Sequence, residues 1–236
     1  MSDTLQDTLD ELLRSGSTTN PALNRLLDDY MRYHLALVAV GSLFMLGFAG
    51  LSISSWTRFR KVPAADQKWT FEKRTYFSFA ALGASLSALL AVVVAANISN
   101  VLEPRTGFAG TLSMIGAAAP GTQTATLHHA FTTWLQSGSG ETPPLVQQSI
   151  DDRLAWQQPK AIICSVLFVV FAWLSTRLWR TLIAKSRPRE PQRNFKTLGL
   201  RAARWSSMTA CLLLMLMVMG NTQASFAPLG LTLLFG

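Results

Sequence analysis

Long uncharged and apolar runs alternate with charged segments along this 236-residue chain. Four stretches without Asp, Glu, Lys or Arg are rich in Leu, Val, Ala and Phe, and they lie at 33–57, 75–102, 161–176 and 205–236. A helix needs about 20 predominantly apolar residues to cross a bilayer. The pattern therefore predicts four transmembrane helices, near residues 35–56, 77–98, 161–179 and 206–222.

A fifth uncharged stretch, at 106–140, is rich in Gly, Thr and Ser and is predicted to lie outside the membrane. The four apolar runs have one alternative interpretation, namely that they form the buried core of a soluble helical bundle. Such cores rarely contain several runs of bilayer length. Composition favours the membrane, because 49% of the residues are hydrophobic and only 14% are charged, against roughly 25% in an average soluble domain. We therefore expect an all-α integral membrane protein.

The basic residues are distributed unevenly among the segments that connect the predicted spans. The connection between the first two spans and that between the last two hold 15 of the 21 Lys and Arg residues. Lys and Arg near helix ends stay on the cytoplasmic side. Both connections are therefore expected in the cytoplasm, and both termini outside, in a protein of the cell membrane. The net charge of +8 is explained by this topology and by attraction to anionic inner-leaflet lipids, without nucleic acid.

The two halves of the chain share a set of residues in the same order and at nearly the same spacing. The pairs are Asp28-Asp29 with Asp151-Asp152, Trp56 with Trp179, Asn97 with Asn221 and Pro104 with Pro228. Each pair is separated by 123 or 124 residues, and the sequence SGS at 15–17 returns at 137–139. Shared order and spacing over nearly the full length predict two tandem repeats, residues 1–121 and 122–236.

Each repeat is expected to follow one plan. An amphipathic outer helix precedes a helix that begins at a proline, with Asn20-Pro21 as a good N-cap and first-turn pair, and that continues into the membrane. Two crossings per repeat keep the copies in the same orientation, so a pseudo-two-fold axis along the membrane normal is predicted. The apolar stripes of the outer helices should pack together or lie on the membrane surface; they are Leu5, Leu9, Leu12 and Leu13, and Leu127, Phe131, Trp134 and Leu135.

Two further residue sets indicate how the spans are placed. Trp56, Trp179 and Trp205 fall at the expected cytoplasmic ends of spans, where amphipathic rings favour the headgroup region, and are interpreted as interface anchors. Gly83, Ser87 and Ala91 recur every fourth residue of the second span. Such small residues let another helix approach closely, so this face is predicted to pack.

Few residues are candidates for chemistry. His128 and His129 are adjacent on a helix and point about 100° apart, so they cannot readily chelate one ion. No EF-hand-like loop surrounds the acid pairs, and Cys164 and Cys211 lie within spans without a CxxC motif. The chain also has no Walker motif, nucleophile elbow or HExxH sequence. We therefore expect no enzyme activity, no metal and no cofactor.

Charged residues are nearly absent from the predicted spans, with Arg177 at the end of the third as the exception. Because proton-coupled carriers, pumps and voltage sensors usually need buried charge, an ion-coupled transporter is disfavoured. We expect a non-catalytic protein that scaffolds or accompanies a membrane complex, with a membrane or cytosolic protein partner and with the outer helices as the recognition surface. The alternative is an oligomeric channel or the membrane component of a transport system, which four helices alone could hardly enclose.

Overall fold

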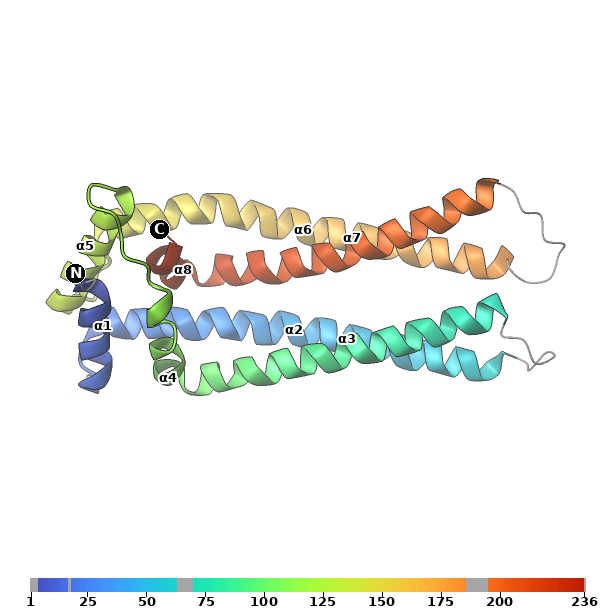
Figure 1. Ribbon diagram of the computed structural model, residues 1–236, viewed down its shortest axis with the longest axis horizontal. Coiled ribbons are helices and arrows are strands. Elements are labelled where there is room, and N and C mark those ends of the chain that lie inside the picture. The colour runs from blue at the N-terminus through green and yellow to red at the C-terminus, as the bar shows by residue number, and fades with distance from the viewer. Residues whose placement is uncertain (1–3, 17, 63–69, 186–194, 236) are drawn as a thin grey trace. The chain divides into compact units, whose positions relative to one another are not determined.

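A computed structural model describes residues 4–16, 18–62, 70–185 and 195–235, with side chains for all of these except 4, 185, 195–205 and 235. Every regular element in these ranges is helical (Figure 1). The four long helices are α2 (Pro21–Lys61), α3 (Phe71–Leu102), α6 (Pro144–Lys185) and α7 (Phe195–Phe226). The short ones are α1 (Thr4–Arg14), α4 (Pro104–Ala109), the 3-10 helix η1 (Leu112–Met114), α5 (Gln123–Ser137) and α8 (Pro228–Phe235).

Each long helix contains one of the predicted spans and is long and apolar enough to cross a membrane. The prediction of an all-α chain with four membrane-compatible helices is therefore confirmed. Helices α2 and α6 have 41 and 42 residues, which at about 1.5 Å per residue is roughly 60 Å. That is about twice the 30 Å of a bilayer's hydrocarbon core, so both helices continue well beyond their apolar stretches.

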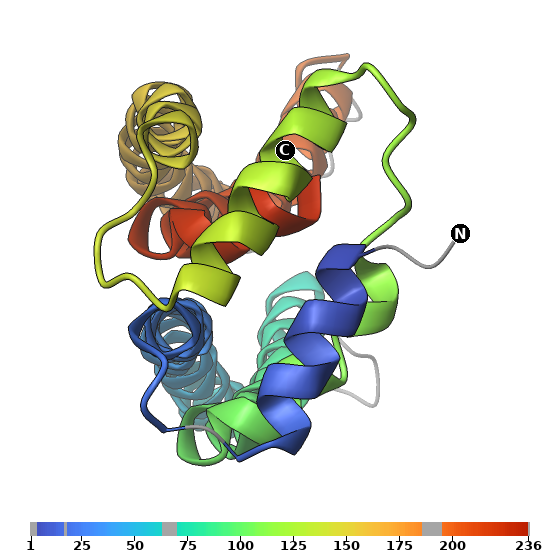
Figure 2. The ribbon, with the colours of Figure 1, turned by 90° about the vertical axis from the view of Figure 1, so that its left-hand side faces the viewer.

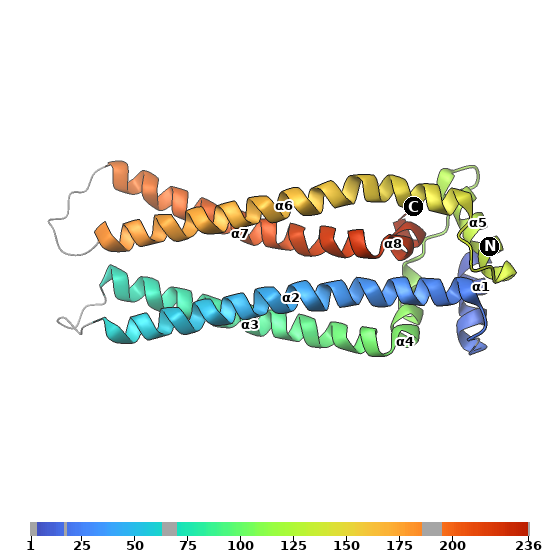
Figure 3. The ribbon, with the colours of Figure 1, turned by 180° about the vertical axis from the view of Figure 1, so that it is seen from behind.

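The chain forms two compact units, and each long helix contributes to both. We call residues 1–39, 95–161 and 220–236 the cap unit, and residues 40–94 and 162–219 the span unit. Within the span unit, α2 runs beside α3 and α6 runs beside α7 (Figures 1 and 3). Both units take segments from both halves of the sequence, so neither unit corresponds to one of the two predicted repeats.

Local hydrogen bonds explain where the cap-unit helices begin and end. Asn20 Oδ1 accepts from Leu23 N at 3.0 Å at the start of α2, which makes Asn20 the N-cap expected from the Asn-Pro pair. Its amide Nδ2 also donates to the Leu135 carbonyl of α5 at 2.8 Å. Helix α5 has Thr122 as its N-cap, whose hydroxyl accepts from Ala125 N, and Gly138 as its C-cap with φ 62°, a left-handed conformation that glycine adopts without strain.

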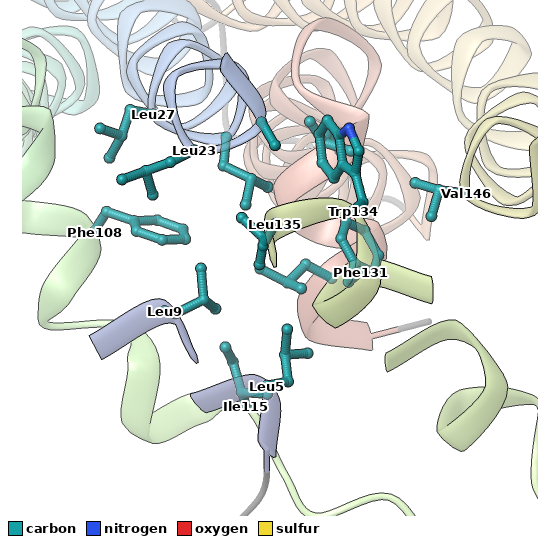
Figure 4. Packing of buried hydrophobic residues seen from close by; sticks show 14 of the residues in the cluster. Leu5, Leu9, Leu23, Leu27, Phe108, Ile115, Phe131, Trp134, Leu135 and Val146 are labelled. Carbon is teal, nitrogen blue, oxygen red and sulfur yellow. The ribbon is translucent and has the colours of Figure 1, made fainter. Parts of the chain in front are cut away.

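The core of the cap unit is made by leucines and aromatic residues from several helices. Helix α1 packs against α4, η1 and α5, and α5 packs against α8; Figure 2 shows α1 in blue and α5 in yellow-green. The fully buried side chains include Leu5, Leu9, Leu23, Phe108, Phe131 and Leu135, several of which are drawn in Figure 4. Both predicted outer stripes therefore contribute to one core, in which their side chains are buried except for the partly buried Leu12.

In the span unit, α2 and α3 approach one another closely at small residues. A Cβ at Gly83 would lie 2.9 Å from the Phe48 carbonyl oxygen, so only glycine fits without a shift. One turn along, the Ser87 hydroxyl donates to the Met45 carbonyl at 3.1 Å. Ala91, the third residue of the predicted packing set, is exposed. Of the three residues in the predicted packing set, Gly83 and Ser87 therefore contact α2, and Ala91 faces away from a close contact.

Candidate functional site

A cavity of about 340 Å³ lies within the span unit, lined by residues of α2, α3, α6 and α7. The lining residues at one end include Arg58, Arg180 and Tyr76. The Arg58 guanidinium carbon is 6.0 Å from the centre of the Tyr76 ring, a cation–π distance. None of the described residues that line the cavity is acidic. This end is therefore positively charged.

The other end of the cavity is apolar. Phe48 of α2, Leu86 of α3 and Phe168 of α6 line it. Arg58 follows Phe48 by ten residues, and Arg180 follows Phe168 by twelve, which at about 1.5 Å per residue separates the two ends by roughly 15–18 Å. The cavity thus has a cationic end and an apolar end about half a bilayer apart.

The cap unit contains a polar cluster that the sequence patterns did not single out. His34 Nδ1 lies 2.6 Å from Asn97 Oδ1, and the His34 ring lies 4.4 Å from that of Tyr30. A Cβ at Gly107 would come within 2.7 Å of the Tyr30 hydroxyl and 2.8 Å of Asn100 Oδ1. Glycine is therefore needed at position 107 for α4 to pack against this cluster.

The contacts of His34 define its tautomer. An amide oxygen only accepts, so at 2.6 Å from Asn97 Oδ1 the Nδ1 atom carries the proton and donates it. Asn100 Nδ2, 3.5 Å from the same Nδ1, then faces a donor and does not bond to it. This tautomer leaves Nε2 of His34 as a hydrogen-bond acceptor.

Asp29, also in the cap unit, caps a helix that is 200 residues away in the sequence. Gly230 N, in the first turn of α8, donates to Asp29 Oδ2 at 2.7 Å. Asp29 lies six residues before the predicted apolar span of α2, and burial raises the pKa of its carboxyl to about 6. Backbone N–H groups of Gly230 and Leu229 and the charge of Arg32 act in the opposite direction but do not cancel the desolvation.

A groove of about 480 Å³ runs along the solvent-facing side of α5 in the cap unit. His129 and Thr133 of α5 line it together with Glu141 and Pro143 of the connection to α6. The Trp134 indole Nε1 donates to the carbonyl of Ser139 at 2.9 Å, which fixes this connection against α5. The groove is therefore bounded by α5 and by the connection to α6 that Trp134 holds in place. Its polar side chains include the charged Glu141 and the neutral Thr133.

The remaining acidic and histidine candidates are scattered. Asp28, Asp151 and Asp152 are exposed, whereas His128 is buried. Gln147 Nε2 donates to Asp151 Oδ1 at 2.9 Å, a local contact within α6. In the part of the chain that the structure describes, no group of three His, Cys, Asp or Glu side chains is placed to hold a metal.

The tryptophans predicted as interface anchors differ in their surroundings. Trp56 is 46% exposed and stacks on Phe59 at 5.3 Å. Trp179 instead packs edge-on against Phe79 of α3, with ring centroids 4.4 Å apart. The side chain of Trp205 lies outside the described residues. Trp179 therefore makes a helix-to-helix contact in addition to any contact with headgroups.

The prolines and asparagines that mark the predicted repeats lie at equivalent points of the helices. Pro104 begins α4 and Pro228 begins α8. Asn97 lies in α3, where it bonds His34, and Asn221 lies in α7 and is partly buried. Position 157, which follows Asp151 as His34 follows Asp28, is a glutamine. The histidine cluster is therefore a feature of the first half only.

The sequence contained a usable signal for this cluster. Tyr30 and His34 are four residues apart, and Asn97 and Asn100 are three apart, so each pair shares one helix face. Their pairing across α2 and α3, more than 60 residues apart, was not encoded in either local pattern.

Comparison of the chain with protein families, with curated proteins and with solved structures finds no match.

Proposed function

We propose that the chain is a non-catalytic multi-pass protein of the cell membrane that scaffolds or accompanies a membrane complex through its cap unit. The observation that carries this proposal is the groove beside α5. It presents His129, Thr133 and Glu141 next to prolines, a mixture of polar groups and rigid apolar surface that suits a protein partner.

The packing of the cap core supports a recognition role for this groove. The apolar stripe of α5 is used internally, with Phe131 and Leu135 at 0% exposure. The opposite side of the same helix is exposed at His129 and Thr133. A folded core behind a polar surface preorganises that surface, which lowers the entropic cost of binding.

The span unit supports a place in a membrane. In the most apolar 18-residue segment of each long helix, only 6% of the residues are buried in α2 and in α6, against 22% in α3 and 28% in α7. Exposed side chains on α6 include Ile162, Val166, Val169 and Trp173. We propose that lipid and partner helices cover these side chains, because a water-exposed surface of this kind would associate.

We also propose that the chain is a tandem duplication, 1–121 and 122–236, with the copies related by an axis along the membrane normal. The helix bounds support this proposal. Helices α2 and α6 begin at Pro21 and Pro144, and α3 and α7 have 32 residues each. Both termini are proposed to lie outside the cell and the basic connections inside, as the distribution of Lys and Arg favours.

Purification of the full chain in mild detergent tests the scaffold proposal. We expect one stoichiometric protein partner, lost from Thr133→Arg, in which a long cation fills the groove. Gln148→Arg, an exposed position of α6 that does not line the groove, is the control and should retain the partner. A homo-oligomer without other proteins, with ion or solute flux after reconstitution in liposomes, would contradict the proposal and favour the channel alternative.

A further inference from the structure

The cavity in the span unit has the chemical layout of an amphiphile. One end is lined by Arg58 and Arg180, whose side chains are exposed, and the apolar end is lined by Phe48, Leu86 and Phe168. The two ends are separated by roughly 15–18 Å, from the ten or twelve intervening residues at about 1.5 Å each. One leaflet contributes about 15 Å of hydrocarbon to a bilayer, so the cavity matches one leaflet in depth.

The two arginines lie at the depth of the headgroups. Arg58 follows Trp56 by two residues and Arg180 directly follows Trp179, and tryptophan is enriched at the membrane interface. Guanidinium groups recognise phosphate oxygens by paired N–H donors. With no acidic side chain among the described residues that line the cavity, a bound phosphate would meet no local repulsion.

We propose that this cavity is a binding site for one anionic phospholipid, with its phosphate at Arg58 and Arg180 and one acyl chain extending toward Phe48 and Phe168. The volume of about 340 Å³ is at the lower end of the roughly 300–1,000 Å³ of small-molecule sites, so the cavity accommodates only part of a phospholipid and the rest stays in the bilayer. The proposal rests on the proposed location in a membrane and is independent of the partner at the cap unit.

The two parts of the site have different roles in this proposal. The apolar part excludes a free phosphate or a soluble phosphorylated metabolite as the occupant, because these have nothing to place against Phe48 and Leu86. The cationic part discriminates against zwitterionic lipids, whose positive headgroup would lie beside two arginines. Both parts are therefore needed to define the lipid class.

Native mass spectrometry of the full chain in mild detergent tests this site, with phosphatidylglycerol and phosphatidylcholine of identical acyl chains as the probes. We expect one phosphatidylglycerol to be retained with at least about tenfold preference, as expected from charge-assisted hydrogen bonds to two arginines. Glycerol phosphate, which has no acyl chain, should not be retained. Equal retention of both lipids, or retention of glycerol phosphate, would overturn the proposal.

Variants locate the site. Arg58→Gln with Arg180→Gln should reduce phosphatidylglycerol retention at least about tenfold. The control, Arg60→Gln with Arg177→Gln, removes two nearby charges that do not line the cavity and should retain the lipid. If the control loses as much lipid as the test pair, the attraction is diffuse and the site is wrong.

A second variant tests the apolar part without altering charge. Ala172 lines the cavity on α6, and Ala172→Phe should fill the space of the acyl chain and abolish retention, while Ala184→Phe, an exposed position on the same helix, should not. Circular dichroism in detergent checks that each variant is folded. If the Ala172→Phe variant is folded and still retains the lipid, the proposed position of the acyl chain is wrong. This result counts even if the variant with both arginines replaced does not fold.

Discussion

Leucines of the same helix have opposite environments in the cap unit and the span unit. In the first turns of α2, Leu23 and Leu26 are completely buried. Farther along α2, in the span unit, Leu43 and Leu46 are 71% and 63% exposed. The first turns of α2 thus contribute to a buried core, whereas its later turns present leucines on an exposed apolar surface. One continuous helix therefore has a part suited to water and a part whose exposed leucines suit an apolar environment.

The largest expected difference between the units concerns large-to-small substitutions. Leu9→Ala removes a fully buried side chain of the cap core and should destabilise the cap unit by about 2–5 kcal/mol. Leu43→Ala, at an exposed position of the span unit, should cost less than about 1 kcal/mol. Hydrogen exchange of the full chain in detergent measures both. Equal effects would remove the distinction between the two units.

A smaller effect is expected at the contact between α2 and α3. Gly83→Ala places a Cβ 2.9 Å from the Phe48 carbonyl oxygen and should destabilise the span unit by about 1–3 kcal/mol. Gly47→Ala on α2 is the control, because a Cβ there meets nothing within 4 Å. Thermal unfolding in detergent compares the two. A neutral Gly83→Ala would show that the helices do not approach so closely.

The next effect is a pH dependence confined to the cap unit. Asp29 has a pKa raised to about 6 from 3.8, so the folded state retains a proton that the unfolded state releases. Stability should therefore fall as pH rises from about 4 to about 6 and then level off. A shift of about two pKa units corresponds to at most ~3 kcal/mol of folding free energy. Because the carboxyl is partly exposed, we expect about 1–2 kcal/mol.

Substitution separates this carboxyl from other titrating groups. Asp29→Asn should flatten the slope between pH 4 and 6 in denaturant unfolding of the cap unit. Asp28→Asn, one residue earlier and exposed, should leave the slope as it is. Identical slopes in the wild type and Asp29→Asn would show that Asp29 is not the group responsible.

The smallest effect is expected at the N-cap of α2. Asn20→Ala removes the acceptor of Leu23 N and the donor to the Leu135 carbonyl and should cost about 1 kcal/mol. Asn20→Asp keeps the acceptor and loses the donor, so it should recover part of this. The melting temperature of the cap unit is the readout. Full recovery by Asp would show that the contact with α5 contributes nothing.

Sequence patterns predicted the features that depend on local spacing. Apolar run length placed the four membrane-compatible helices, and the Asn-Pro pair placed the start of α2. Packing of the two outer stripes against each other was one of the two arrangements predicted, but polar contacts between distant segments were missed. Asp29 and Gly230 are 201 residues apart, and neither local pattern carries information about the other. The span-unit cavity was missed for the same reason, because Arg58 and Arg180 belong to different helices, and periodicity along one helix does not specify packing between helices.

The structure also changes which positions suit a topology experiment. The C-terminus is expected outside the cell, but the side chain of Thr232, near that end, is only 1% exposed in the cap unit. Its hydroxyl donates to the Pro228 carbonyl within α8. A cysteine there would be protected by packing and not by a membrane. Ser139, which is exposed, is the better reporter for the cap unit.

Cysteine accessibility in intact cells tests most directly whether a membrane separates the cap unit from the basic connections. In a chain with Cys164 and Cys211 replaced by alanine, Ser139→Cys should react with an impermeant thiol reagent. Ser186→Cys, in the basic connection between the third and fourth spans, should react only after the membrane is permeabilised. Labelling of Ser186→Cys in sealed cells, or equal labelling of the two positions before permeabilisation, would contradict the account.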